Sequence, residues 1–103
     1  MFSSWQNINV DNSSMRTYVS TPESETKVPA IVVIQGQTGV DDFMQFTRMV
    51  ASDGFVGAAP DLYHRDPPDC KDDAPTRRMR LTDKTLIADI NATIEHLKSH
   101  PAV

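Results

Sequence analysis

The sequence lacks the features that mark secreted, membrane-spanning and disulfide-rich proteins. Cys70 is its single cysteine, so no disulfide can form within the chain, which suits a reducing compartment. The longest apolar run, Val28–Ile34, contains Pro29 and falls far short of the roughly 20 residues of a membrane-spanning helix. The first twenty residues hold no apolar core of a secretory signal. These absences predict a cytoplasmic protein.

An excess of positive charge is also missing. The 14 Asp and Glu residues outnumber the 10 Lys and Arg residues, which gives a formal net charge of −4. Such a chain has no electrostatic attraction for phosphate backbones or anionic lipid, so neither nucleic acid nor a membrane is an expected partner. The composition, with 39% hydrophobic residues in a chain of 103, fits one soluble domain with a core of its own.

What is present begins with β patterns. Apolar residues alternate loosely over Trp5–Val10 and again over Met15–Val19, and the polar segment 11–14 between them favours a turn. This predicts an antiparallel hairpin. The run 30–34 is continuously apolar and rich in β-branched residues, which is typical of a strand buried on both faces of a parallel sheet.

A helix and a second buried strand should follow. Asp41 or Asp42 is the expected cap at the start of the helix, and Gly54 suits its end. Four apolar residues share one helical face: Phe43, Phe46, Met49 and Val50. Residues 55–59 then form the next strand, which Pro60 ends.

The last part of the chain is expected to hold a loop and a helix. Residues 64–80 are rich in Asp, Pro and Arg, which predicts a long surface loop. A helix over 82–99 follows, and its apolar stripe consists of Leu86, Ile87, Ile90, Ile94 and Leu97. The pattern as a whole predicts an α/β fold, with an N-terminal antiparallel hairpin followed by parallel strands and helices packed on the sheet.

Two segments carry a family resemblance: PAIVVIQGQTGVDD at 29–42 and DGFVGAAPDLYHR at 53–65. They resemble the dienelactone hydrolase family of α/β-hydrolases, the first its strand and oxyanion-hole turn, the second its next strand and Pro-Asp-Leu-Tyr segment. The resemblance covers nearly the whole chain but only about the first half of a family member. It implies that residues 1–103 are a single incomplete α/β-hydrolase domain, without the nucleophile elbow and the C-terminal half.

The chain departs from the family pattern in two ways. The family's turn often reads Gln-Glu-Ile-Phe-Gly, whereas residues 35–39 read Gln-Gly-Gln-Thr-Gly, with Gly36 in the place of the glutamate. A glutamate-switched nucleophile is therefore not expected, and the turn is closer to the His-Gly-x-x-Gly turn of ordinary esterases. The family's G-x-C-x-G elbow, acid and histidine would lie beyond Val103, so no member of the catalytic triad is expected here.

Gly36 and Gln37 are the candidate oxyanion-hole residues. Acyl-transfer enzymes need backbone N–H groups aimed at a developing negative charge, and a glycine-bearing turn at the end of a central strand can supply one. The family pattern assigns this donor to the backbone N–H of Gln37. The alternative is a plain strand-to-helix turn that needs a positive φ at Gly36 or Gly39.

Tyr63 is the first candidate substrate-binding residue. It follows the C-terminal end of a strand, where α/β sheets place ligands, so it either lines a pocket or packs against the sheet. Its neighbour Asp61 is expected to cap the following turn with its carboxylate.

Three arginines complete the candidates: Arg77, Arg78 and Arg80. Family members that act on carboxylate-bearing lactones hold the carboxylate with an arginine from this region, since a guanidinium donates two parallel hydrogen bonds. The alternative is a solvated segment that pairs with Asp72, Asp73 and Asp83.

No metal, cofactor or local nucleophile is expected. The Asp, His and Cys residues of 61–73 match neither EF-hand nor zinc spacing. Cys70 lies in a loop rich in Pro and Asp rather than in a G-x-C-x-G turn, so we expect a free thiol. His96 and His100 lie on or just past the last helix and are expected to be solvated or to cap it.

The leading hypothesis is the N-terminal portion of a dienelactone hydrolase-like enzyme, similar to carboxymethylenebutenolidases. The complete enzyme would hydrolyse a small-molecule ester or lactone by nucleophilic acyl transfer, without a cofactor, and the isolated chain would be inactive. The alternative is a non-catalytic half-domain that pairs with a complementary half or forms a homo-oligomer through an exposed sheet edge.

Overall fold

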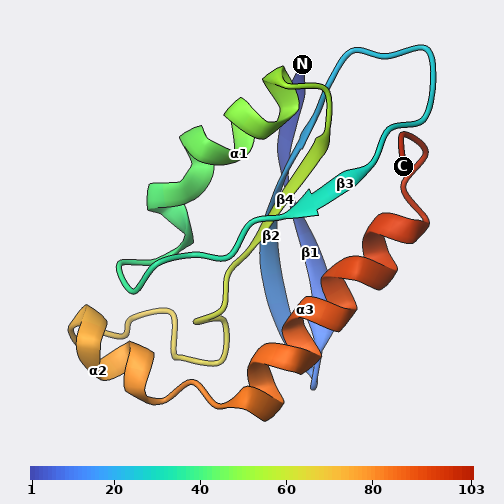
Figure 1. Cartoon of the computed structure of the whole chain (residues 1–103). Helices are drawn as coiled ribbons and strands as arrows, with labels where there is room; N and C mark the ends of the chain where they lie inside the picture. Colours follow the sequence, from blue (N-terminus) through green and yellow to red (C-terminus); the bar gives the residue numbers. More distant parts are fainter.

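The computed structural model, which describes residues 1–103, contains a four-stranded sheet with helices on both faces (Figure 1). The strands are β1 (Phe2–Val10), β2 (Ser13–Thr21), β3 (Ala30–Val32) and β4 (Val56–Pro60). They are arranged in the order β1-β2-β4-β3, and β3 is parallel to β4 while the other two pairs are antiparallel. This arrangement confirms the predicted α/β fold with an N-terminal hairpin.

The hairpin turns tightly at its tip. Asp11 and Asn12 have φ angles of 51° and 61°, so both central residues of the two-residue turn lie in the left-handed region. A turn of this kind matches the right-handed twist of the strands, and Asp and Asn tolerate it better than most residues. The tip thereby places Asp11 and Ser13 next to the segment that follows β4.

The two parallel strands differ in burial. Every residue of β4 is buried, as its unbroken apolar run predicts, and the strand includes Pro60 as its last residue because that position needs no backbone donor. β3 pairs with β4 alone, and Ile31 and Ile34 are 40% and 48% exposed. The prediction that the run 30–34 is buried on both faces is therefore wrong.

The first helix starts later than predicted. A 3₁₀ helix, η1 (Val40–Phe43), contains Asp41 and Asp42, and α1 (Met44–Ser52) follows with Phe43 at its N-cap. Neither aspartate caps either helix with its side chain, so that prediction is wrong. Gly54 does take the predicted positive φ, at 94°.

The buried face of α1 is also different from the predicted one. Phe46 and Met49 are 53% and 57% exposed, while the packed residues are Thr47, Val50 and Ala51. The reason is Gly57 of β4, where an added Cβ would lie only 2.9 Å from the carbonyl oxygen of Thr47. The helix approaches the strand too closely for aromatic side chains to fit between them.

Residues 64–80 are not the continuous loop that was predicted. They contain α2 (Ala74–Met79), which begins at Asp73, whose carboxylate accepts a hydrogen bond from Thr76 N at 2.9 Å. Aspartate at the N-cap and Pro75 in the first turn both favour a helix start. The same two residue types suggested a loop when they were read as composition alone.

The long helix α3 (Asp83–Lys98) has the predicted extent, with Thr82 as N-cap in a capping box with Thr85. Its buried stripe is displaced from the predicted one. Ile87 and Ile94 are 58% and 39% exposed, whereas Asp89 and Thr93 are fully buried. The helix thus turns a carboxylate toward the sheet.

The core lies in two layers, one on each face of the sheet (Figure 1). Tyr18 and Ala59 pack under α1, while their chain neighbours Val19 and Ala58 pack with Leu97 under α3. This alternation is the period of two that a strand imposes. No helix combines the length and the apolar character needed to cross a membrane.

Candidate active site

A hydrogen-bonded turn follows the end of β3. The N–H of Gly39 donates to the carbonyl oxygen of Gly36 at 3.1 Å, which makes Gln37 and Thr38 the central residues of a β-turn. The positive φ is at Gly39, at 111°, and not at Gly36. The backbone N–H of Gln37 donates to no acceptor within the chain. This turn thus presents an unused backbone donor at the end of a parallel strand.

Two hydrogen bonds fix the turn to the segment after β4. Leu62 N donates to Gln35 Oε1 at 2.9 Å, and Tyr63 Oη donates to the carbonyl oxygen of Gln37 at 2.7 Å. Tyr63 is 5% exposed, so its hydroxyl is held by the packing of its ring. The orientation of the Gln37–Thr38 peptide is therefore set by a buried side chain. Sequence reasoning treated Tyr63 as a pocket or packing residue and did not single out Gln35.

A small pocket lies beside this turn, with a volume of about 220 Å³. We call it the turn pocket. It is lined by Ile34, Gln35, Gly36, Gln37, Leu62, Tyr63, Arg78, Leu81 and Leu86. It brings four of the sequence candidates together, Gly36, Gln37, Tyr63 and Arg78, and no acidic residue contributes to its wall.

The structure separates the three candidate arginines. Arg77 Nε lies 2.8 Å from Asp66 Oδ2, and its guanidinium lies 4.5 Å from the centre of the Tyr63 ring. Arg80 pairs with Asp66 at 3.2 Å and with Asp72 at 2.7 Å. The side chain of Arg78 makes no ion pair or hydrogen bond within the chain, which leaves it available to a ligand.

Asp66 is the residue that holds Arg77 and Arg80. Burial by itself would raise the pKa of Asp66, but the hydrogen bonds from Arg77 and Arg80 outweigh burial and hold that pKa below its ordinary value. Of the partners expected for the arginines, only Asp72 is used, while Asp73 caps α2 instead.

Gly36 lies against the ring of Phe43. A Cβ added at Gly36 would be 3.1 Å from Cζ of Phe43, which is closer than ordinary carbon contacts. A glutamate at this position would therefore require the ring to shift. The local packing fits the glycine of this chain.

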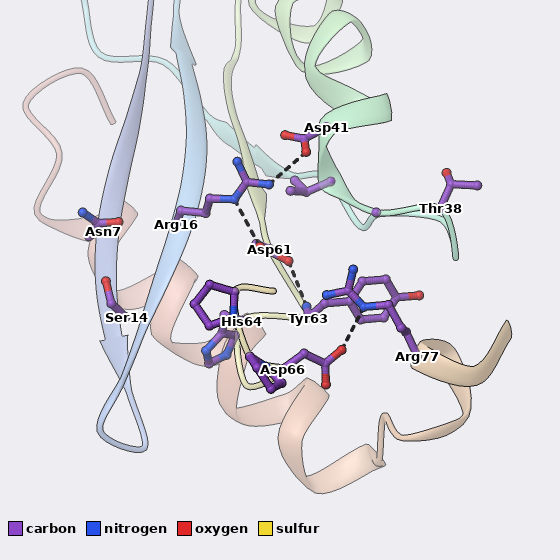
Figure 2. A pocket seen from close by; sticks show the side chains of 14 residues that line it. Asn7, Ser14, Arg16, Thr38, Asp41, Asp61, Tyr63, His64, Asp66 and Arg77 are labelled. Atoms are coloured by element: carbon purple, nitrogen blue, oxygen red, sulfur yellow. Dashed lines mark hydrogen bonds and ion pairs between the residues drawn. The ribbon is translucent and has the colours of Figure 1, made fainter. Parts of the chain in front are cut away.

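A larger cleft of about 470 Å³ lies between the hairpin, the turn and the segment after β4 (Figure 2). We call it the hairpin cleft. Its charged groups are already paired: Arg16 lies 3.0 Å from Asp41 and 3.2 Å from Asp61, and Arg77 bonds to Asp66. Asp61 also accepts from Tyr63 N at 2.9 Å, which confirms its predicted role in the turn. Tyr63 forms part of the wall of both cavities.

A buried network that sequence reasoning missed joins the hairpin to α3. His64 Nδ1 lies 2.8 Å from Ser13 Oγ, and His64 Nε2 lies 2.9 Å from Asp89 Oδ1. Arg65 donates twice to Asp89, at 2.9 Å each, and once to Asp11 at 2.8 Å. The one signal in the sequence is Asp89 itself, a carboxylate beside the apolar stripe of a helix.

The residue types of this network are those of a hydrolase triad, but its setting is structural. The side chains of His64 and Asp89 are 1% and 0% exposed, and Ser13 lines none of the cavities. Ser13 Oγ also lies 3.2 Å from the carbonyl oxygen of His64. Burial would raise the pKa of Asp89, but the hydrogen bonds from His64 and Arg65 outweigh burial and lower it. The network ties three segments together.

The remaining candidates lie outside both cavities. Cys70 is free, as predicted, and its Sγ lies 3.7 Å from Asp72 and 3.6 Å from Arg80. His96 is half-buried and bonds to Gln6 Oε1 at 2.7 Å, so the prediction that it is solvated or capping is wrong. His100 Nδ1 accepts from Ala102 N at 3.0 Å. No three His, Cys, Asp or Glu side chains are grouped so that they could hold a metal ion.

The sequence profile of the Dienelactone hydrolase family matches residues 15–103. The chain belongs to the dienelactone hydrolase family. A Synechocystis protein assigned as a carboxymethylenebutenolidase is 28% identical over 101 residues, which cover 89% of this chain and 41% of that protein. The chain therefore spans less than half the length of this curated relative of the dienelactone hydrolase family.

Two solved structures share the fold of this chain. A Klebsiella pneumoniae protein assigned as a dienelactone hydrolase superimposes with a TM-score of 0.86 at 23% identity, covering 99% of this chain and 45% of that one. Est1E from Butyrivibrio proteoclasticus superimposes with a TM-score of 0.71 at 19% identity, covering 98% and 37%. At these identities the likeness concerns the fold, which is the N-terminal part of an α/β-hydrolase.

Proposed function

We propose that this chain supplies the oxyanion turn and part of the substrate pocket of an enzyme that hydrolyses small ester or lactone bonds. Residues 1–103 would form a single incomplete domain. The nucleophile, the acid and the histidine of the triad would come from polypeptide outside these residues. The chain's place in the dienelactone hydrolase family and its coverage of 41% of a curated relative support this proposal.

The observation that carries the proposal is the unused N–H of Gln37. It follows a parallel strand and belongs to the Gly36–Gln37 peptide, whose carbonyl oxygen accepts from Gly39 N at 3.1 Å. Tyr63 Oη fixes the next peptide, at 2.7 Å from the Gln37 carbonyl oxygen. Because α/β sheets bind ligands at the carboxyl ends of their strands, this is where a reacting carbonyl is expected. A donor that is fixed before the reaction stabilises the developing charge without having to reorganise.

The chemistry is an acyl transfer in two halves. A thiol or hydroxyl group attacks the carbonyl carbon, its proton passes to the histidine, and the carbonyl oxygen becomes an oxyanion that accepts from Gln37 N–H. The carbon–oxygen bond then breaks and the alkoxide leaves as an alcohol with that proton. Water repeats the sequence on the acyl-enzyme and releases the acid. Gln37 acts on the oxyanion in both halves.

Arg78 is the arginine that we assign to a substrate carboxylate. Its neighbours Arg77 and Arg80 are already bound to aspartates, while Arg78 lines the turn pocket with no partner. A guanidinium can hold a carboxylate through two parallel hydrogen bonds. This assignment favours esters or lactones that carry a carboxylate.

The decisive experiment removes the Gln37 N–H in a polypeptide that contains both this segment and the nucleophile elbow. Gln37→Pro deletes the donor at the second position of a β-turn, where proline fits the backbone. We expect kcat to fall by roughly 10²- to 10³-fold. Gln37→Ala, which keeps the N–H, should lose far less. Equal losses in the two variants would contradict the oxyanion role.

A second experiment uses the 103-residue chain alone. Because the triad would lie outside it, we expect no turnover of p-nitrophenyl acetate above the rate with serum albumin at equal concentration. Turnover at enzymatic rates would show that the chain holds its own nucleophile and would refute the division of the site. Reading the coding DNA beyond codon 103 for a G-x-C-x-G or serine equivalent checks the same point.

A second candidate function rests on the free edge of β3. This strand pairs with β4 alone, and Ile31 and Ile34 are exposed beside it. An exposed apolar strand edge favours pairing with another strand, so the isolated chain is expected to form a homo-oligomer through this edge. Light scattering on a size-exclusion column tests this, and Ile31→Lys should restore the monomer. A wild-type monomer at high concentration would rule out this candidate.

A further inference from the structure

The strand β1 is an unprotected edge of the sheet. It lies at the end opposite to β3 and pairs with β2 alone (Figure 1). Its nine residues, Phe2–Val10, include no charged residue, no proline and no glycine. They pair one to one with Ser13–Thr21, so no bulge interrupts the strand. Natural sheets protect their edges with charges, prolines, bulges or short strands, and β1 has none of these features.

The neighbouring strand shows which backbone groups of β1 are free. Asp61 N donates to the carbonyl oxygen of Arg16 at 2.9 Å, so this oxygen of β2 points away from β1. Arg16 lies opposite Asn7, and in an antiparallel pair alternate residues direct both N–H and C=O groups to the same side. The residues of β1 whose backbone groups face the open edge are therefore Ser3, Trp5, Asn7 and Asn9.

Trp5 is a fixed but exposed aromatic residue of this edge. Its ring lies 5.1 Å from the centre of the Tyr18 ring, and the Arg16 guanidinium lies 4.5 Å from the centre of the Trp5 ring. The residue is nevertheless 37% exposed. Phe2 is 70% exposed and, by the alternation of the strand, shares the other face with Ile8, on which α3 packs. Both faces of the edge thus carry an uncovered aromatic ring.

The side chains of β1 are complementary to a second copy of the same strand. In an antiparallel pair centred on Trp5, that residue lies opposite itself and Phe2 of each copy lies opposite Ile8 of the other. Phe2 would thereby extend the apolar cluster of Ile8, Val10 and Met15. The polar residues meet polar residues, since Ser3 lies opposite Asn7 and Ser4 opposite Gln6. Because β1 has no charge, self-pairing opposes no like charges.

We propose that β1 pairs with β1 of a second copy, so that two four-stranded sheets join around a twofold axis at Trp5. The two α3 helices do not obstruct this arrangement. Each packs on β1 beside Ile8 through Ala88 and Ala92. The two Ile8 residues would be six positions apart along the paired strands, or about 20 Å at ~3.3 Å per residue. Packed helices need only about 8–10 Å between their axes.

This interface is independent of the proposed catalytic site and of the β3 edge. It uses the opposite end of the sheet, so neither the oxyanion turn nor a strand added beside β3 affects it. A single strand from each copy forms a small contact, and interfaces below about 1,200 Å² belong to transient complexes. We therefore expect a weak dimer that forms at high concentration.

The test is sedimentation equilibrium of the Ile31→Lys chain, in which the added charge blocks the β3 edge. We expect a monomer at the roughly 10 µM of a sizing column and mostly dimer near about 1 mM, as for a transient interface. Trp5 is the only tryptophan, so its emission reports on the dimer axis and should shift to shorter wavelength over the same range. A monomer at the higher concentration would overturn the proposal and leave the edge to a strand of another protein. A dimer with unchanged emission would place the contact elsewhere and overturn it as well.

The variant for this experiment is Asn7→Pro in the Ile31→Lys chain, and its control is Asn7→Ala. Proline removes one free N–H of each copy and is tolerated on an edge strand where that group faces solvent, whereas alanine keeps the donor. We expect Asn7→Pro to raise the dissociation constant of the dimer at least about tenfold, because two hydrogen bonds are lost, and Asn7→Ala to leave it unchanged. Equal constants would overturn the proposal.

Amide exchange keeps the proposal testable if Asn7→Pro fails to fold. In the Ile31→Lys chain, the backbone amides of Trp5 and Asn7 should exchange more slowly as the concentration rises, because the second copy supplies their acceptors. The amide of Gln6, which is directed toward β2, should not change. Exchange at Trp5 and Asn7 that is independent of concentration would overturn the proposal.

Discussion

The hairpin side of the molecule and the turn pocket treat their polar groups in opposite ways. In the His64 network, Asp89 accepts from His64 and twice from Arg65, and Arg65 also reaches Asp11. Beside the turn, Gln35 Nε2, Gln37 N–H and Arg78 have no acceptor. Saturated groups hold segments together and have nothing left for a ligand. Unpaired groups that line a pocket, such as those of Gln37 and Arg78, contribute few bonds to the fold and are available for binding.

The largest effect is expected when a bond of the His64–Asp89–Arg65 network is removed. Asp89→Asn leaves the buried His64 ring and the half-buried Arg65 against a neutral group, and breaking a buried pair costs about 3–5 kcal/mol. Urea unfolding followed by circular dichroism measures the loss. The control is Glu95→Gln on the exposed face of the same helix, where about 0.5 kcal/mol or less is expected. Similar midpoints for both variants would show that the network is not structural.

The same network predicts a pH dependence. The pKa values of Asp89 and Asp66 in the folded protein lie below their ordinary value. At low pH the folded protein therefore binds fewer protons than the unfolded chain. The stabilisation by these two carboxylates is complete above about pH 4 and is lost as the pH falls through the folded pKa values. The difference in unfolding free energy between wild type and Asp89→Asn should therefore shrink as the pH falls from 4 toward the folded pKa of Asp89. A difference that grows as the pH falls would contradict this sign.

Tyr63 joins the two regions, and its hydroxyl tests the link. Tyr63→Phe keeps the ring under Arg77 and removes the bond to the Gln37 carbonyl oxygen, at a cost of about 1 kcal/mol. We expect faster amide exchange at residues 37–39 than in wild type, with unchanged exchange in β1. Uniform acceleration over the whole sheet would mean that the hydroxyl stabilises the fold in general rather than the turn.

The smallest effect is expected at the unsaturated side. Arg78→Gln should leave the urea midpoint unchanged, because the side chain has no partner to lose. Arg77→Gln should cost about 1 kcal/mol, since it removes both the Asp66 pair and the contact with the Tyr63 ring. A destabilised Arg78→Gln protein would show that Arg78 has a structural role. It would contradict our assignment of Arg78 as an unpaired, ligand-binding arginine.

The sequence predicted the elements that local patterns control. The hairpin, the buried strand β4, the positive φ at Gly54 and the extent of α3 follow from alternation, apolar runs, glycine and helix caps. The composition of residues 64–80 led to a wrong prediction of a continuous loop. Asp73 and Pro75 instead start the helix α2, because their positions suit the N-cap and the first turn. Helical faces were misjudged because tertiary contacts decide them: Gly57 brings α1 too close for Phe46 to be buried.

The candidate site was predictable only as far as motifs reach. The turn at Gly36 and Gln37 and the nearby Tyr63 and arginines could be named from the family pattern. The choice of Arg78 among the three arginines could not be predicted. It depends on the ion pairs that Arg77 and Arg80 form with Asp66 and Asp72. Gln35 was missed for a related reason, since an unpaired amide nitrogen is visible only when the partners of its oxygen are known.

Gly57 has a consequence for how this scaffold can change. A methyl group there would meet the main-chain oxygen of Thr47, which cannot swing aside as a side-chain tip would. Even alanine at position 57 would move α1 away from the sheet. Because η1 and the turn at residues 36–39 directly precede α1, they would move with it. The absence of a side chain at Gly57 thus fixes the distance between the sheet and α1. A homologue with a larger residue at this position is expected to differ in the turn before α1 as well.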